Sequence, residues 1–278
     1  MSIKLNILWS GWVLPMPRPT CLCNICNEAR EKWIPYSRTG CSMFLYNWNV
    51  LFDTPEEIRL QLNREKINKI EHVILTHWHP DHTQWLRILE HLNWNFAFNK
   101  PYWKQINVYI SDWQKNMFSK LSCGGFLDYY EQKWMINLVV LEHKKEIIIN
   151  DIIITPYLIE HTKWFYFLIN DWNKKVVYAM CEYHKLLVYP EIKDVDLLIA
   201  HNLFWENPEI SPRKNKPTDE DSFEKMLLDA EKMGTKNIYL NHIEETFQLW
   251  HDDLAYKMKK YYPNYNIVPT YDWMILDL

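Results

Sequence analysis

The sequence predicts an α/β protein in which two β-sheets pack face to face and helices cover their outer faces. Strand-like and helix-like segments mix in both halves of the 278-residue chain. The chain shows no internal repeat and no low-complexity linker. Its length and its hydrophobic content of 48% allow a full core, so we expect residues 1–278 to form a single domain.

The first half predicts a sheet built from strands that alternate with helices. Thr54 can cap a helix, Pro55 suits its first position, and Glu57 can complete a capping box. A Pro-rich loop at 15–19 leads into a cysteine cluster. In order, we expect a strand at 3–9, a hairpin at 41–52, a helix at 54–68, a strand at 71–76, a helix at 81–92, an aromatic loop at 93–105, a strand at 106–110 and a helix at 112–121.

The second half predicts more strands than the first. Strand patterns dominate residues 135–181, with hairpin turns near Asn150-Asp151 and at 170–174. Gly234 is suited to ending a helix. The remaining elements are a strand at 196–200, a polar loop at 205–218, a helix at 222–233, a strand at 236–240, a helix at 251–261 and a last pair of strands at 266–276.

Ligand-type side chains cluster directly after the strand at 71–76. The run Thr76-His77-Trp78-His79-Pro80-Asp81-His82 holds three imidazoles and a carboxylate within six residues. Zn²⁺ and related metals prefer imidazole nitrogen and carboxylate oxygen as ligands. A loop at the end of a strand can aim these side chains in two directions. The run therefore predicts a metal site that can hold two ions.

This H-x-H-x-D-H run resembles the signature of the metallo-β-lactamase superfamily, whose fold is a four-layer αβ/βα sandwich. The resemblance implies further ligands in a fixed chain order. His161 follows the strand-like stretch at 152–159, and His242 follows the one at 238–241. Between them the resemblance implies an acidic ligand, and Glu182 fits this place after the stretch at 176–180.

Cys181, the neighbour of Glu182, is a second candidate for this acidic place. Adjacent strand residues point to opposite faces, so only one of the two should reach the metal. We favour Glu182 because a carboxylate can bridge two ions and because the Cys-then-acid order resembles part of the superfamily.

The resemblance implies a site with two zinc ions, with Mn²⁺ as an alternative. The first ion would be held by His77, His79 and His161, the second by Asp81, His82 and His242, with Glu182 bridging them. Two ions can deprotonate a shared water, and the resulting hydroxide can attack a phosphoryl or carbonyl group. Asp81 can also orient this hydroxide, and His201 can donate a proton to a leaving group. Asp53 and Asp272 are candidates to accept hydrogen bonds from ligand imidazoles.

A second group of ligand-type residues narrows the resemblance. Cys21, Cys23 and Cys26 form a C-x-C-x-x-C cluster, and three thiolates can converge on one tetrahedral ion. With Trp9-Ser10-Gly11 and the run 38–42, this cluster looks like the PhnP-like phosphodiesterase branch, where it binds a structural zinc. The fourth ligand expected there is His, but the chain has Glu245, and Cys41 is an alternative. The branch also has a proton-donating His where this chain has Glu220.

The resemblance implies a zinc-dependent phosphodiesterase acting on a small or cyclic phosphodiester. The alternatives are a carbonyl ester, thioester or lactone hydrolase on the same site, and a non-catalytic metal-stabilised binding module. The net charge of −4 argues against general nucleic-acid binding. No apolar stretch is long enough for a membrane span, and we expect a cytoplasmic protein. A homodimer is expected only by analogy with the branch.

Overall fold

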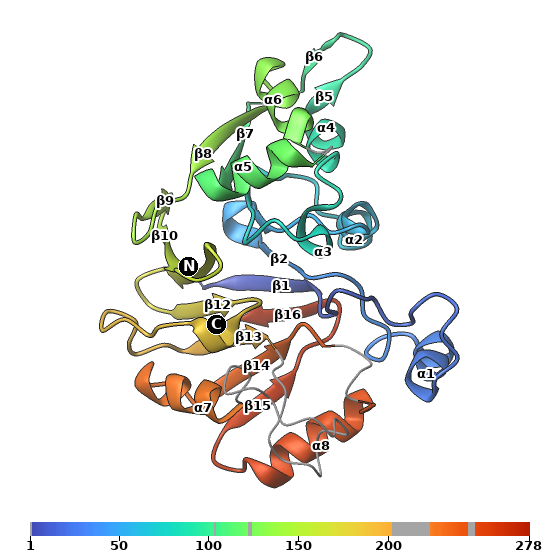
Figure 1. Ribbon diagram of the computed structural model, residues 1–278, viewed down its shortest axis with the longest axis vertical. Coiled ribbons are helices and arrows are strands. Elements are labelled where there is room, and N and C mark those ends of the chain that lie inside the picture. The colour runs from blue at the N-terminus through green and yellow to red at the C-terminus, as the bar shows by residue number, and fades with distance from the viewer. Residues whose placement is uncertain (1, 103, 122–123, 202–222, 244–247) are drawn as a thin grey trace.

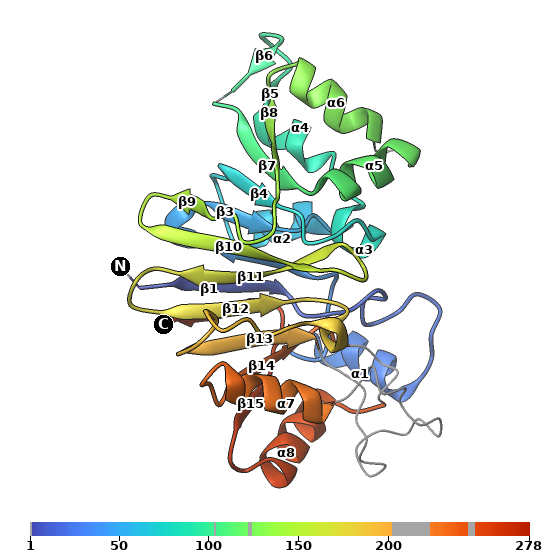
Figure 2. The same ribbon diagram turned by 60° about the vertical axis from the view of Figure 1, so that its left-hand side comes forward.

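The computed structural model describes residues 2–102, 104–121, 124–201, 223–243 and 248–278. Within these residues, two seven-stranded sheets face each other and helices lie on both outer sides (Figures 1 and 2). This arrangement confirms the predicted four-layer sandwich. In the same part of the chain, every helix is too short or too polar to span a lipid bilayer.

The first sheet joins the N-terminal half to the very end of the chain. This half also contains the small hairpin of β5 (Trp94–Asn95) and β6 (Lys100–Pro101) and, among its helices, α2 (Ile58–Arg64), α4 (Ile88–Asn93), α5 (Asp112–Lys120) and α6 (Gly124–Gln132). The strands run, across the sheet, β16 (Met274–Asp277), β1 (Lys4–Trp9), β2 (Ser42–Leu45), β3 (Val50–Phe52), β4 (His72–Ile74), β7 (Ile106–Ile110) and β8 (Ile136–Val140).

The second sheet is formed by the C-terminal half. Helices α7 (Phe223–Lys232) and α8 (His251–Tyr261) cover its outer face (Figure 1). The strands run, across the sheet, β15 (Asn266–Pro269), β14 (Asn237–Asn241), β13 (Leu197–His201), β12 (Lys175–Ala179), β11 (Trp164–Asn170), β10 (Ile152–Ile159) and β9 (Ile147–Ile149). The neighbours β12, β13 and β14 are parallel, so their carboxyl ends meet at one edge of the sheet.

The central strands are almost continuously apolar because both of their faces are buried. In β12, Val176 and Tyr178 pack between the two sheets, whereas Val177 and Ala179 pack against the outer helices. Successive strand residues point to opposite faces, so a strand covered on both sides needs apolar residues at every position. This explains why residues 135–181 resemble strands without a clear alternation.

The helix predicted at 54–68 is shorter, and its predicted cap is wrong. Helix α2 begins at Ile58, and Glu57 occupies the cap position without a side-chain hydrogen bond. The backbone of Thr54 instead forms hydrogen bonds with the segment that carries the histidines. Its amide donates to the His82 carbonyl, and its carbonyl accepts from the Trp85 amide. These long-range bonds replace the local cap, so the segment 53–57 runs alongside the loop that carries the histidines.

Other local differences also come from tertiary contacts. The predicted helix at 81–92 is two short helices, α3 (Pro80–Thr83) and α4. Helix α1 (Asn24–Lys32), helix α6 and the β5–β6 hairpin were not predicted. The capping box of α5 is present, with Ser111 and Gln114 bonding each other reciprocally.

The last two strands do not pair with each other as the sequence suggests. β15 lies beside β14 in the second sheet, while β16 lies beside β1 in the first. Between them the tail crosses from one sheet to the other, and Thr270 and Asp272 are buried at this crossing. The end of the chain therefore helps to hold the two sheets together.

Candidate metal centre

The histidine run forms the loop after β4, with Pro80 at the start of α3. His77 and His82 are fully buried, and His79 is half-buried. The rings of His77 and His82 lie 4.0 Å apart, and those of His77 and His79 lie 4.8 Å apart. The four-residue turn of α3 thus folds the run onto itself, so that its imidazoles share one small volume.

Asp53 orients His82 from behind. It follows β3, lies fully buried, and accepts hydrogen bonds from the Thr76 amide at 2.8 Å and the Thr76 hydroxyl at 2.9 Å. Its Oδ2 atom is 2.7 Å from His82 Nδ1. Since an ionised carboxylate only accepts, Nδ1 carries a hydrogen and Nε2 is the ring nitrogen that faces the site. The prediction that Asp53 supports an imidazole is therefore confirmed.

Side chains from two further strand ends, and Asp81 from its own loop, meet His82. Its Nε2 atom lies 3.2 Å from Nε2 of His242, which follows β14, and 3.5 Å from Sγ of Cys181, which follows β12. The Asp81 carboxylate lies 3.3 Å from His82 Nε2 and 3.6 Å from His242 Nε2. Within the described residues, ligand atoms of Asp81, His82 and His242 all lie within 4.8 Å of one another.

These contacts set the charges of the site. Burial opposes charge, but Asp81 and Asp53 outweigh it and raise the pKa of His82 well above its usual value. The charges of His242 and His82 likewise outweigh burial and lower the pKa of the Cys181 thiol. Burial and the neighbouring imidazoles lower the pKa of His77 well below its usual value. The site thus holds an anionic carboxylate and an acidified thiol beside the neutral imidazole of His77, and a metal ion that binds His82 would displace a proton from it.

The donor set fits a metal cation. His77 Nε2 is buried, and no described residue gives it a hydrogen-bond partner. Two imidazole nitrogens 3.2 Å apart, next to a thiol and a carboxylate, form a set of lone-pair atoms that Zn²⁺ prefers.

His161 and Glu182 lie elsewhere. His161 is exposed in the turn between β10 and β11. Among the described residues, it does not belong to any cluster of His, Cys, Asp or Glu side chains that could hold a metal ion. Glu182 is half-buried at the start of the short 3-10 helix η2 (Tyr183–Lys185) and also lies outside those groups. At the acidic position the structure therefore brings in the Cys181 thiol instead of the favoured Glu182 carboxylate.

Two tryptophans and His201 form the walls of the site. Trp164 packs on His77 and His79, with ring separations of 4.2 and 4.7 Å. His201 ends β13, and its ring lies 4.6 Å from His242 and 4.8 Å from Trp12. Its ligand atom groups with those of Cys181 and His242. Nothing in the sequence singles out these two tryptophans, because the chain contains 15.

The cysteine cluster is a separate group at the start of α1. Cys21, Cys23 and Cys26 offer sulfur atoms within 4.8 Å of one another, and the Arg18 amide donates to Cys26 Sγ at 3.3 Å. Hydrogen bonding with Cys23, helped by Arg18, lowers the pKa of Cys21 to about 7. Three converging sulfurs, one of them readily ionised, fit a soft metal ion.

Cys41 does not join this cluster. It is fully buried between the sheets, 3.5 Å from the Tyr178 hydroxyl, and burial raises its pKa to about 12. The alternative that Cys41 completes the cluster is therefore wrong. Glu245, the other candidate, lies outside the described residues, as do Glu220 and the loop at 205–218.

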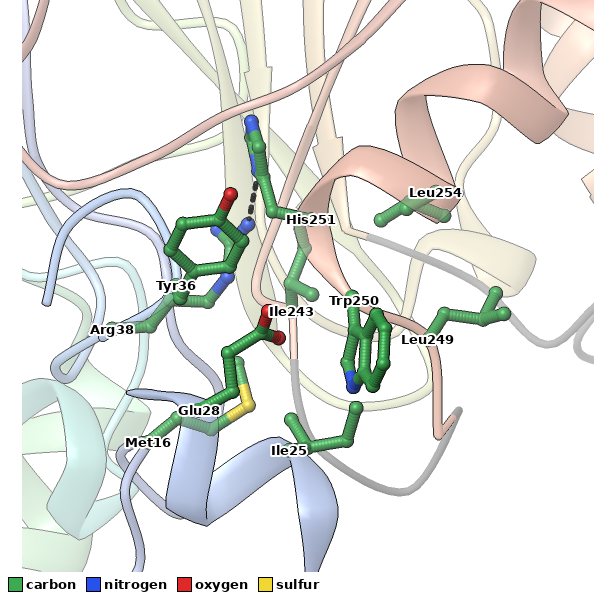
Figure 3. Close-up of a pocket in the computed structure, with 10 residues that line it drawn as sticks. All are labelled: Met16, Ile25, Glu28, Tyr36, Arg38, Ile243, Leu249, Trp250, His251 and Leu254. Carbon is green, nitrogen blue, oxygen red and sulfur yellow. Dashed lines mark hydrogen bonds between the residues drawn. The ribbon is translucent and has the colours of Figure 1, made fainter. Parts of the chain in front are cut away.

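Arg38 fixes the loop that leads to the site, and Asp272 supports Arg38 instead of an imidazole. Arg38 donates to the Thr270 carbonyl and to Ser10 Oγ at 2.8 Å. It also donates to His251 Nδ1 at 2.9 Å, and Figure 3 shows this bond. Ser10 Oγ in turn donates to Asp272 at 2.8 Å. The cavity beside these groups measures only about 10 Å³, enough for one water at most. This network therefore serves the fold and not a ligand.

The Arg38 contact predicts how stability changes with pH. Burial, and then the Arg38 charge, lower the pKa of His251 to about 4. An unfolded His has a pKa of about 6.5, so below this pH the unfolded chain binds a proton that the folded protein excludes. Stability is therefore full at neutral pH and falls as the pH drops toward 4. From about pH 7 to about pH 5, wild type should lose about 1 kcal/mol more unfolding free energy than His251→Gln.

Urea unfolding of both proteins at the two pH values measures this difference. Gln can still accept a hydrogen bond from Arg38 but does not titrate, so effects of the other histidines cancel. Equal losses in the two proteins would contradict the assignment to His251.

The chain is similar to a known protein family in sequence and to solved structures in fold. A family model described as a beta-lactamase superfamily domain matches residues 48–243. No sequence among the curated proteins matches the chain significantly. The chain is similar to the structure of a diphosphatase from the PhnP family, with 19% identity and a TM-score of 0.73 over 100% of this chain and 98% of that one.

Two further solved structures are similar over nearly their full lengths. One is the metallo-beta-lactamase fold protein YhfI from Bacillus subtilis, with 16% identity and a TM-score of 0.71 over 100% of both chains. The other is Zn(2+)-bound PqqB from Methylobacterium extorquens, with 14% identity and a TM-score of 0.67 over 99% of this chain and 100% of that one. At these identities the likeness shows a common fold.

Proposed function

The chain belongs to the metallo-β-lactamase superfamily, and on this premise we propose that it is a metal-dependent hydrolase that cleaves small or cyclic phosphodiesters. The observation that carries this proposal is the convergence of Asp81 and His82, which follow β4, with Cys181 after β12 and His242 after β14. Each follows a strand whose carboxyl end opens to the same side, which is where α/β proteins place their active sites.

The donor set supports zinc as the metal. Asp81, His82, Cys181 and His242 would hold one ion, and His77 with His79 would contribute to a second. A thiolate donor favours Zn²⁺ over Mn²⁺, which prefers oxygen ligands. Such ions supply Lewis acidity and activate water at neutral pH. His161 would join only if the turn at 160–163 rearranged.

The protein's own side chains would position and shield the reaction. Asp53 fixes the ring of His82, so that its Nε2 atom stays aimed at the site. Trp12 and Trp164 cover the imidazoles and exclude bulk water from one side. His201 groups with Cys181 and His242, which supports a ligand role more than the predicted role as a proton donor.

A phosphodiester is the substrate class best supported. One structural relative is a diphosphatase, which also acts on a phosphorus centre. The Cys21-Cys23-Cys26 cluster adds the feature that resembles the phosphodiesterase branch.

Purified protein tests the proposal directly. We expect metal analysis to find zinc, and we expect kcat/KM for bis-p-nitrophenyl phosphate to exceed that for p-nitrophenyl acetate. A zinc-loaded protein that cleaves neither this diester nor cyclic nucleotides would contradict the proposal. Faster cleavage of the acetate would favour a carbonyl esterase on the same site.

The choice between Cys181 and Glu182 predicts different metal affinities. Cys181→Ser should weaken zinc binding about 100-fold, since Cys181 lies 3.5 Å from His82 Nε2. Glu182→Gln, the matched control one residue away, should change it by less than about threefold. Competition with a chromophoric chelator measures both values. A larger effect of Glu182→Gln would restore Glu182 as the ligand.

A further inference from the structure

A second cavity lies at the opposite ends of the strands from the metal centre. It encloses about 450 Å³ between the start of β4, the start of β7 and helix α4. Ile70, Ile106 and Leu92 form an apolar wall, and the first two are almost fully buried. None of its lining residues belongs to a metal-ligand group of the described chain. Its volume is in the range of sites for small organic molecules.

His72 supplies a polar group to this cavity in a defined tautomer. Asn137 Nδ2 donates to Asn107 Oδ1 at 2.9 Å, which leaves Asn107 Nδ2 to face His72 Nδ1 at 3.4 Å. The Tyr109 hydroxyl lies 3.0 Å from the same nitrogen. Because an amide NH₂ can only donate, His72 Nδ1 is an acceptor.

The other ring nitrogen of His72 is therefore a donor. Burial lowers the pKa of His72, so the ring is neutral and its hydrogen sits on Nε2. No described residue accepts the hydrogen of Nε2, and this atom is not among the fully buried ones, so it reaches the surface of the cavity or the solvent. It is therefore accessible, and it belongs to a residue that lines the cavity, so an occupant can accept a hydrogen bond from it.

The rim of the cavity is cationic. Lys69 and Lys104 are exposed and line the opening. Among the described lining residues the carboxylate is that of Glu71, which lies 2.9 Å from the Lys69 ammonium and accepts a hydrogen bond from Asn49 at 2.8 Å. The charges of Glu71 and Lys69 therefore offset each other, and the ammonium group of Lys104 can attract a negatively charged group of a ligand.

We propose that this cavity binds a small organic anion, whose acidic group lies near Lys104 and His72 Nε2 and whose apolar body packs on Ile70, Leu92 and Ile106. The combination of an apolar wall, one imidazole donor and a cationic rim matches a carboxylate, sulfonate or phosphate monoester that carries a ring. The site does not depend on the hydrolytic function proposed above.

The fluorescent probe 1-anilinonaphthalene-8-sulfonate tests this site in the full-length protein. We expect saturable binding at one site. Lys104→Glu should raise the Kd about tenfold by reversing the rim charge. Lys100→Glu is the matched control, because Lys100 is an exposed lysine on β6 that does not line the cavity. It should leave the Kd within about twofold.

A second variant tests the cavity itself. Leu92→Trp should fill the space and weaken the probe by at least about tenfold. Circular dichroism would show that each variant is folded. Equal effects of Lys104→Glu and Lys100→Glu, or undiminished binding to folded Leu92→Trp, would overturn the proposal by placing the probe elsewhere.

Discussion

Replacing His82 by alanine is expected to reduce hydrolysis of bis-p-nitrophenyl phosphate by at least about 1,000-fold, equivalent to about 4 kcal/mol. His82 is fully buried, bonded to Asp53, and 3.2 Å from the facing nitrogen of His242. Its loss removes a metal ligand and leaves the Asp53 carboxylate without the imidazole that donates a hydrogen bond to it. Bound zinc should fall by about one ion per chain, measured by elemental analysis.

His91→Ala is the control for this experiment. His91 is exposed on α4, and its ring contacts only Trp85 among the contacts described. It should keep activity within about twofold of wild type. If His82→Ala retained both zinc and activity, the converging side chains would not be the metal site.

Arg38→Met is expected to lower the free energy of unfolding by about 3–5 kcal/mol. The Arg38 guanidinium is fully buried, and it joins Ser10, Thr270 and His251 from three segments that are distant in sequence. Methionine fills much of the same space but donates no hydrogen bond. It would also leave the buried Asp272 without the nearest cation that offsets its charge.

Urea unfolding measures this loss, with Arg59→Met as the control. Arg59 is exposed on α2, so its replacement should change stability by less than about 0.5 kcal/mol. A loss below about 1 kcal/mol for Arg38→Met would show that the network contributes little.

The sequence predicted the parts of the site that are local. Residues 76–82 carry their own geometry, because a strand end and one helical turn are enough to bring His77 and His82 together. The sandwich fold could also be predicted from the sequence, since strand and helix patterns mix in both halves of the chain. These features depend on neighbours within a few residues, which a sequence displays directly.

The remaining features depend on contacts between distant segments. The choice between Cys181 and Glu182 depends on the turn after β12, where both residues adopt positive φ and the simple alternation of a strand no longer applies. The exposure of His161 depends on how the turn at 160–163 leaves β10. Thr54 does not cap α2 as predicted, because its backbone forms hydrogen bonds with His82 and Trp85. No spacing rule reports such choices.

The pairing of β16 with β1 has a kinetic consequence. Lys4 lies opposite Asp277, so one edge of the first sheet forms only when nearly the whole chain has been drawn into a single loop. Contacts between such remote segments slow the search for the native state, because the entropy of closing the loop must be lost before the hydrogen bonds form. Refolding should therefore be slow compared with a helical protein of this size, and completion of that edge belongs among its late events.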